Sequence, residues 1–333
     1  MRVLVVRLGA LGDIVHTVPA VAALADARPG IEIDWLVDAR HRAVLDLFAL
    51  PVRAIPIHLS GSWRATLAEV RALRARRYEA ALDFQGLLKS AVCARASGAR
   101  RVIGFARAAL REPAAAFLYT ERVDPGPERH VIAKNLALLG ALGVHDDAIR
   151  VPLAGRVLGT PAPAGEPRVV LNPGAGWPNK QWAPERFGQL AAAILHAHGL
   201  RSVVTWGPGE EDLARAVVAA SDGAAEPAPS TTIAGLMEIL KTGALVVSGD
   251  TGPIHLAAAA ARPIVGLYGP TDPARNGPWS VNDITVSRFD ACQCHHKRRC
   301  RRATRCLDDI AIDDVVRAAA LRLGRVGSDG PSR

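Results

Sequence analysis

The 333-residue sequence lacks long apolar runs. It has no uninterrupted apolar stretch of about 18 residues or more, the length at which a transmembrane helix becomes a candidate. The first residues also lack the basic, apolar and small-residue sections of a signal peptide. Hydrophobic residues make up 49% and charged residues 22%, as in an ordinary globular chain. We therefore expect a cytoplasmic protein with no membrane-spanning helix.

Aromatic residues are scarce, at 5% of the chain. No helix-turn-helix, zinc-finger or aromatic RNA-binding signature is present, so a nucleic-acid partner is poorly supported despite a net charge of +9. Lysine is scarce too, and almost all of the positive charge is arginine. That charge has two explanations: the base composition of the genome, or an anionic partner such as a nucleotide, a phosphorylated sugar or a lipid surface.

Short apolar runs alternate with helical patterns, such as those over Trp63–Arg76 and Pro184–His198, and this scheme occurs twice. Runs such as Val3–Val6 and Val169–Asn172 do not alternate with polar residues, which is typical of strands buried on both faces of a parallel sheet. The sequence therefore predicts two Rossmann-like, doubly wound α/β domains with a cleft between them. The expected boundaries are a first domain over 1–154, a linker over 155–167, a second domain over 168–312, a helix over 313–325 that packs back on the first domain, and a disordered tail over 326–333.

Four polar clusters follow predicted strands, and ligands bind beyond the carboxyl ends of strands in sheets of this kind. They are GALGD (9–13), NPGAGWPNKQW (172–182), GPGEE (207–211) and SGDTGPIH (248–255). The first departs from the dinucleotide fingerprint Gly-x-Gly-x-x-Gly, which disfavours an oxidoreductase. Its acid, Asp13, stands where a phosphate would rest on a helix N-terminus and would repel it. The residues alone leave Asp13 two roles, a helix cap or a base.

The clusters of the second half suit a nucleotide. Lys180 supplies a compact positive charge for phosphate oxygens, and Glu210 can accept hydrogen bonds from ribose hydroxyls. The backbone amides at Thr251 and Gly252 open a helix and form an anion site. Taken singly, Lys180 is equally explained as a solvated lysine, and Glu210 as an acid placed favourably in a helix dipole. Together the clusters predict a sugar nucleotide held by the second half.

Four of the five cysteines lie close together in the sequence, at Cys292, Cys294, Cys300 and Cys306. Their spacing differs from the paired C-x₂-C pattern of common zinc sites. It leaves open a structural metal, reduced thiols or an adventitious disulfide, and the adjacent basic run leaves open a contact with anionic lipid. The fifth, Cys93, stands in an apolar helical segment, where we expect it in the core.

Several ordered motifs extend the pattern over nearly the whole chain: GALGDIVHTVPA, ALDFQGLLKSA, REPAAAF, NKQWAPERF, SGDTGPIHLAAA and YGPTDP. With them the sequence resembles glycosyltransferase family 9, the bacterial heptosyltransferases, and most nearly their heptosyltransferase I type. The resemblance implies a GT-B arrangement, with the first domain on the acceptor side and the second on the donor side. It implies ADP-L-glycero-D-manno-heptose as donor and a Kdo sugar on lipid A, in the lipopolysaccharide inner core, as acceptor. The enzyme would be a cofactor-free monomer, peripheral on the cytoplasmic face of the inner membrane.

The resemblance also implies roles for individual residues. Asp13 would be the general base. Donor binding falls to Gly176, Lys180 (diphosphate), Glu210 (ribose), Asp250 (heptose), Thr251 and Gly252 (phosphates) and His255. Acceptor binding falls to Gly12, Arg64, Gln85, Lys89 and Arg111. Where some relatives have threonines, this chain has Ala175-Gly176, whose backbone amides would substitute. No Asp-x-Asp pair is present to hold a metal on the diphosphate, so we expect no metal.

Three other functions remain as alternatives. A heptosyltransferase of the second type, or another family 9 transferase, would use a different sugar acceptor. A sugar-nucleotide epimerase would consume the donor without any acceptor. A non-catalytic nucleotide- or lipid-binding protein would bind ADP but release none from ADP-heptose.

Overall fold

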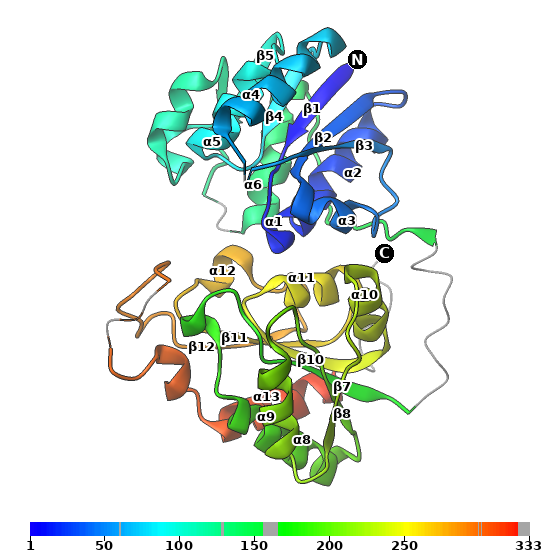
Figure 1. The fold of residues 1–333 in the computed structure, drawn as a ribbon, viewed down its shortest axis with the longest axis vertical. Coiled ribbons are helices and arrows are strands. Elements are labelled where there is room, and N and C mark those ends of the chain that lie inside the picture. The colour runs from blue at the N-terminus through cyan, green and yellow to red at the C-terminus, as the bar shows by residue number, and fades with distance from the viewer. Residues whose placement is uncertain (60, 128–129, 156–165, 299, 301, 326–333) are drawn as a thin grey trace. The chain divides into compact units, whose positions relative to one another are not determined.

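The computed structural model describes residues 1–59, 61–127, 130–155, 166–298, 300 and 302–325. The chain divides into two compact units, residues 1–155 and 156–333 (Figure 1). Most of the expected linker and the whole expected tail, 326–333, lie outside the described residues. None of the described helices combines the length and the hydropathy that crossing a membrane requires.

The first unit is built on a six-stranded parallel sheet in the order β3-β2-β1-β4-β5-β6. Its strands are β1 (Arg2–Val6), β2 (Glu32–Asp38), β3 (Val52–Ile57), β4 (Ala80–Asp83), β5 (Arg101–Phe105) and β6 (Glu121–Val123). Its helices are α1 (Leu11–Val15), α2 (Val18–Ala27), α3 (Arg42–Leu45), α4 (Trp63–Ala72), α5 (Leu88–Ala96) and α6 (Val131–Leu138). Residues Val3–Val6 are fully buried, as expected of a central strand covered on both faces.

The second unit repeats this plan with the sheet order β12-β11-β10-β7-β8-β9, again parallel throughout. Its strands are β7 (Arg168–Asn172), β8 (Ser202–Val204), β9 (Ala225–Pro227), β10 (Gly243–Gly249), β11 (Ile264–Tyr268) and β12 (Ile284–Ser287). Its helices are α8 (Pro184–His198), α9 (Glu211–Ala219), α10 (Ile233–Thr242), α11 (Gly252–Ala259), α12 (Pro273–Asn276) and α13 (Ile312–Gly324). Counted within its own unit, each sheet has the order 3-2-1-4-5-6 of the Rossmann fold. The predicted fold class, α/β with two Rossmann-like parallel sheets, is confirmed.

Short 3₁₀ segments connect several elements. They are η1 (Ala39–His41), η2 (Leu73–Arg76), η3 (Arg107–Ala109), η4 (Pro113–Leu118), η5 (Leu139–Leu142), η6 (Pro178–Lys180) and η7 (Cys306–Asp309). The helical pattern predicted for residues 63–76 is divided between α4 and η2.

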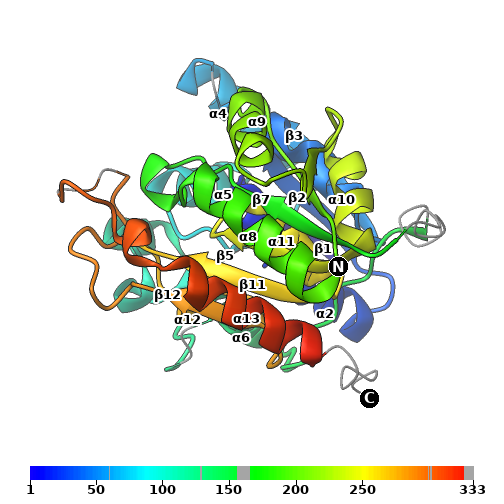
Figure 2. The same cartoon turned by 90° about the horizontal axis from the view of Figure 1, so that it is seen from below.

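The C-terminal helix α13 lies within the range 313–325 in which the sequence predicts a helix, apart from its first residue, Ile312. It packs against α8 and against β10, β11 and β12 of its own unit, and Figure 2 shows it running beside α8. Its buried residues Val315, Ala318 and Ala319 belong to the same core as Val247 and Leu267. The apolar face of α13 is therefore used within the second unit, and a contact of this helix with the first domain stays a prediction.

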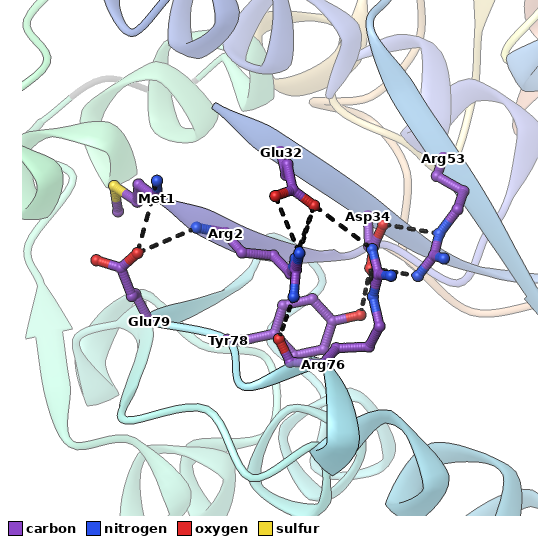
Figure 3. Close-up of polar contacts among 8 residues, drawn as sticks. All are labelled: Met1, Arg2, Glu32, Asp34, Arg53, Arg76, Tyr78 and Glu79. Atoms are coloured by element: carbon purple, nitrogen blue, oxygen red, sulfur yellow. Dashed lines mark hydrogen bonds and ion pairs between the residues drawn. The ribbon is translucent and has the colours of Figure 1, made fainter. Parts of the chain in front are cut away.

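An ionic network joins the amino ends of β1, β2 and the segment before β4 (Figure 3). Its centre is Asp34, which is only 2% exposed and accepts hydrogen bonds from Tyr78 (2.5 Å), Arg53 (2.7 Å) and Arg76 (3.3 Å). Arg2 bonds to Glu32 at 2.8 Å in the same group. A buried carboxylate needs such partners to be tolerated. This network fixes the sheet end opposite the predicted site, where the strands begin.

Candidate functional site

In the first unit the loop after β1 is fixed by a buried arginine. Arg7 directly follows β1, and its side chain is only 5% exposed. Its guanidinium donates to the Phe84 carbonyl at 2.5 Å and to the Asp13 carbonyl at 3.2 Å, and it pairs with the Asp13 carboxylate at 2.9 Å. Phe84 follows β4, so Arg7 ties together the loops after β1 and β4. These two strands flank the point where the strand order reverses, which is the usual ligand site of such sheets.

Asp13 stands at the third position of α1, and Ala10 occupies the N-cap position. The second carboxylate oxygen of Asp13 accepts a hydrogen bond from the Ala10 amide at 3.3 Å. The side chain is nevertheless 46% exposed. Both roles considered for this residue therefore have a basis in the structure: the carboxylate closes the first turn of α1, and it is open enough to accept a proton. Gly12 is buried beside it.

The loop after β4 carries Gln85 and lies against the loop of Asp13. The side-chain oxygen of Gln85 accepts a hydrogen bond from the Leu8 amide at 2.9 Å. Below it, the fully buried Asp83 accepts hydrogen bonds from Ser90 and Tyr119, at 2.9 and 2.8 Å. Burial raises the pKa of Asp83, although these donors act in the opposite direction. Asp83 therefore shapes the loop, and Gln85 links it to the loop that follows β1.

His41, which sequence reasoning missed, stands beside the glycine turn. A side chain at Gly9 would meet the His41 ring at 2.7 Å, so the absence of a side chain lets the ring lie against the backbone. Burial lowers the pKa of His41, although the charges of Asp38 and Asp13 act in the opposite direction. No sequence pattern marks His41, because it comes from the segment after β2.

The other predicted acceptor residues, Arg64, Lys89 and Arg111, are all exposed. Lys89 and Arg111 lie on neighbouring segments, because the Leu88 amide bonds to the side chain of Glu112 at 2.7 Å. Arg64 stands at the start of α4, after the edge strand β3. Helix α4 packs against α5, the helix that carries Lys89, so the three residues come from segments that adjoin α5.

In the second unit Lys180 and Asp250 form a close ion pair, 2.5 Å from nitrogen to oxygen. Lys180 comes from the loop after β7 and Asp250 from the loop after β10, so the pair joins the two loops at the strand-order reversal. Asp250 is 4% exposed and Lys180 is 15% exposed at the side chain. The lysine also lies 4.6 Å from the ring centre of Trp177.

Two further side chains hold Asp250. Asn276, at the end of α12, donates to it at 2.6 Å, and the His255 ring lies 3.5 Å away. Burial alone would raise the pKa of Asp250, but the His255 contact and the Lys180 charge hold it well below its usual range. Asp250 is thus a fixed anion that orients the lysine. Asn276 was missed because it lies 26 residues further along the chain.

Thr251 is the N-cap residue of α11, and Gly252 is its first helical residue. The Thr251 hydroxyl lies 3.3 Å from both Ser248 and Asn172, so its side chain is held by the loop itself. The adjoining backbone amides at the helix N-terminus then remain as the group suited to an anion. The phosphate site expected at the backbone of these residues stays a prediction.

Glu210 lies against the loop that leads to the lysine. Its carboxylate accepts a hydrogen bond from the Gly207 amide at 3.0 Å, and a side chain at Gly174 would overlap it at 2.1 Å. Gly174 therefore permits the close approach of Glu210. At Gly176, by contrast, a Cβ would meet no atom within 4 Å, so this predicted donor residue borders open space.

The cysteine cluster forms a small core of its own. Cys292, Cys294 and Cys306 are buried, Cys300 is half-buried, and all are free thiols. The Cys292 sulfur lies 3.5 Å from that of Cys294 and 3.6 Å from that of Cys306. In the described part of the chain, no group of three or more His, Cys, Asp or Glu side chains is arranged to hold a metal ion. Cys93 is fully buried, as predicted.

The sequence is similar to those of known proteins over most of its length. Residues 66–305 match the model of glycosyltransferase family 9 (heptosyltransferase). The chain is 32% identical over 303 residues to lipopolysaccharide heptosyltransferase 1 of Escherichia coli (strain K12), covering 85% of this chain and 92% of that protein. It is 30% identical over 320 residues to the protein of the same name from Pseudomonas aeruginosa, covering 90% and 87%.

A solved structure extends the similarity to the fold. The E. coli heptosyltransferase WaaC with ADP-2-deoxy-2-fluoro heptose has a TM-score of 0.78 and 28% identity, over 96% of this chain and 99% of that one. The family model covers well over half of the sequence, and the two curated relatives are matched over most of their length. The chain therefore belongs to glycosyltransferase family 9, the heptosyltransferases.

Proposed function

We propose that this protein is an inverting heptosyltransferase that moves L-glycero-D-manno-heptose from ADP-heptose to a Kdo sugar of lipid A–Kdo in the lipopolysaccharide inner core. The names of its curated relatives support the lipopolysaccharide core, and the ligand bound to WaaC supports an ADP-heptose donor. An acceptor anchored by lipid A would have the protein work as a peripheral enzyme on the cytoplasmic face of the inner membrane.

One observation carries the chemistry. The first unit presents a half-exposed carboxylate, Asp13, fixed by the buried Arg7. The second presents an ammonium, Lys180, fixed by the buried Asp250, together with the N-terminus of α11. Glycosyl transfer to a hydroxyl requires a group that takes up a proton and groups that stabilise a departing diphosphate. The two units supply one of each.

In the proposed reaction Asp13 takes the proton of the acceptor hydroxyl as that oxygen bonds to the anomeric carbon of heptose. The bond from that carbon to the diphosphate oxygen breaks on the opposite face, so the configuration inverts. Negative charge builds up on the departing ADP, where Lys180 and the amides of Thr251 and Gly252 act on it. Asp250 and His255 would face the heptose, and Glu210 the ribose.

On the acceptor side, Gln85 and Gly12 would lie nearest the reacting hydroxyl. Lys89, Arg111 and Arg64 would contact the anionic Kdo and lipid A groups. Because the sequence offers no Asp-x-Asp pair, we propose that the transfer needs no metal.

The test is turnover with defined substrates. ADP release from ADP-heptose is measured with lipid A–Kdo, with a heptose-extended acceptor, and with no acceptor, each with and without excess chelator. We expect release only with lipid A–Kdo, and at the same rate in chelator. Preference for the extended acceptor would identify the second type of transferase, donor loss without acceptor an epimerase, and ADP binding without release a binding protein. Loss of activity in chelator would contradict the metal-free reaction.

A further inference from the structure

The cysteine cluster lies in the segment 289–306. In the second unit this segment is hydrogen-bonded to two loops, one after β7 and one after β11. The Asn179 side chain donates to the Lys297 carbonyl at 2.7 Å, and the His296 amide donates to the Pro270 carbonyl at 2.8 Å. A side chain at Gly269 would meet the Cys306 sulfur at 2.9 Å. We call residues 289–306 the cysteine loop. Its thiol core lies directly against the loop that follows β11.

The cysteine loop also places a guanidinium near Lys180. The guanidinium carbon of Arg298 lies 5.7 Å from the ring centre of Trp177, and the Lys180 nitrogen lies 4.6 Å from the same point. The two cations are therefore no more than about 10 Å apart, which is about one Debye length at 0.1 M salt. Both can act on a single small anion at this place.

Arg298 differs from the other described arginines of its loop. Arg302 pairs with Asp309 at 2.7 Å, and Arg305 pairs with Asp308 at 3.2 Å. Arg298 is exposed, and within the described residues its guanidinium has no carboxylate partner. Its planar group can contact the face of an aromatic ring and still offer paired N–H donors to phosphate oxygens.

The charge balance of the site leaves room for such a residue. Lys180 is the expected diphosphate cation, but the Asp250 carboxylate 2.5 Å away offsets most of its charge. The N-terminus of α11 adds only about half a positive charge. A diphosphate carries more negative charge than these groups can neutralise, so a further cation nearby stabilises it.

We propose that Arg298 is a further binding residue for the diphosphate of the sugar nucleotide, held over Trp177 by the cysteine loop. That the diphosphate belongs to a sugar nucleotide rests on the proposed function. The contact proposed for Arg298 requires only the oxygens of a diphosphate. Two probes separate the two proposals: ADP, and inorganic pyrophosphate, which has no nucleoside.

The experiment measures the Kd of both probes by calorimetry for the full-length wild type, Arg298→Ala, Arg298→Lys and the control Lys297→Ala. The control removes an exposed charge from the adjacent position of the same loop and leaves the backbone carbonyl that Asn179 uses. We expect Arg298→Ala to raise both Kd values roughly tenfold. Arg298→Lys should recover part of the loss, and Lys297→Ala should bind like the wild type.

Salt gives a second measurement. Binding should weaken with salt less steeply in Arg298→Ala than in the wild type between about 0.01 and about 0.15 M. Unchanged Kd values for Arg298→Ala, or an equal loss in Lys297→Ala, would overturn the assignment. A wild type that binds pyrophosphate but not ADP would instead overturn the proposed donor, while the comparison of variants would still be decided with pyrophosphate.

Discussion

Each unit holds an ion pair at the point where its strand order reverses, and the two pairs have opposite polarity. In the first unit the buried member is the cation Arg7, at 5% exposed, and the open member is Asp13, at 46%. In the second the more deeply buried member is the anion Asp250, at 4%, and the more open member is Lys180, at 15%. The same fold thus presents an acid in one unit and an ammonium in the other.

This difference shows how one sheet order serves two kinds of chemistry. A charge removed from water must be paired, so burying one member of the pair fixes the position of the other. Arg7 is anchored by the Phe84 carbonyl, and Asp250 by Asn276. The sign of the buried member therefore sets the sign of the more open group: a carboxylate in the first unit and an ammonium in the second.

The largest expected effect comes from removing the open acid. Asp13→Asn keeps the shape of the side chain but removes its basicity, so turnover should fall by about 10²- to 10⁴-fold. ADP affinity should not change, because the nucleotide is assigned to the second unit. Steady-state ADP release and calorimetric titration with ADP measure the two quantities.

Asp46→Asn is the matched control for this variant. Asp46 is a half-buried acid of the same unit, with a side chain about as exposed as that of Asp13, and it is paired with Arg42 on α3. Its substitution should leave both quantities as in the wild type. Full turnover in Asp13→Asn would show that the two pairs do not differ in function as proposed.

The second effect tests the opposite pair. Lys180→Met leaves the buried Asp250 without its ammonium partner, which should lower the free energy of unfolding by about 3 kcal/mol. The thermal midpoint of the second unit should then fall by about 6–12 °C. The double variant Lys180→Met with Asp250→Asn should recover most of this loss, because no uncompensated charge remains. A double-mutant cycle by calorimetry measures the coupling energy between Lys180 and Asp250. Losses of unfolding free energy that simply add in the double variant would contradict the prediction.

The same pair gives a pH dependence. The pKa of Asp250 is lower in the folded state than its ordinary value of 3.8, so the unfolded state takes up the proton first as the pH falls. The stability that this carboxylate contributes is present above pH 3.8 and is lost below it, towards the depressed value. The difference between the wild type and Lys180→Met should therefore be constant near neutral pH and shrink only in acid.

We expect a smaller effect from substitutions at two glycines, Gly249 at the end of β10 and Gly176 in the loop after β7. A Cβ at Gly249 would meet the Lys180 carbonyl oxygen at 2.8 Å, so Gly249→Ala must displace the lysine loop. We expect its Kd for ADP to rise about fivefold, which corresponds to about 1 kcal/mol. Gly176→Ala is the control, because a Cβ there meets no atom within 4 Å and the amide is kept. Equal affinities in the two variants would show that the position of the loop does not matter.

The central elements of both units could be predicted from sequence, because buried parallel strands leave uninterrupted apolar runs. Val3–Val6 and Val169–Asn172 fall within β1 and β7, and α8 has the predicted bounds Pro184–His198. The short strands β6, β9 and β12 were missed. All three are edge strands of three or four residues, too short to form a pattern.

The site was predictable where glycines and a charged residue follow a strand, as at Asp13 and Asp250. It was not predictable where a partner comes from a distant segment, as with Asn276 or His41. Arg7 could have been found, since a basic residue between a buried strand and a glycine turn points to a buried pair. The packing of α13 against α8 and β10–β12 could not be predicted, because an amphipathic pattern shows that one face of a helix is buried but not what covers it.

The smallest expected effect concerns His41, which lies beside the acid of the first unit, as His255 lies beside Asp250 in the second. Burial lowers its pKa below the ordinary 6.5, so the folded state resists protonation of the ring. As the pH falls below 6.5 the unfolded state therefore gains the proton first, and the first unit loses stability. His41→Gln cannot titrate, so its urea midpoint should fall less than that of the wild type between about pH 8 and about pH 5.

His145→Gln provides the control, because it makes the same substitution at an exposed histidine of the same unit. Its urea midpoint should change with pH as the wild type's does. If His41→Gln also follows the wild type, the ring is not a proton-sensitive neighbour of Asp13. The opposite polarity of the two pairs would then remain as the difference between the units.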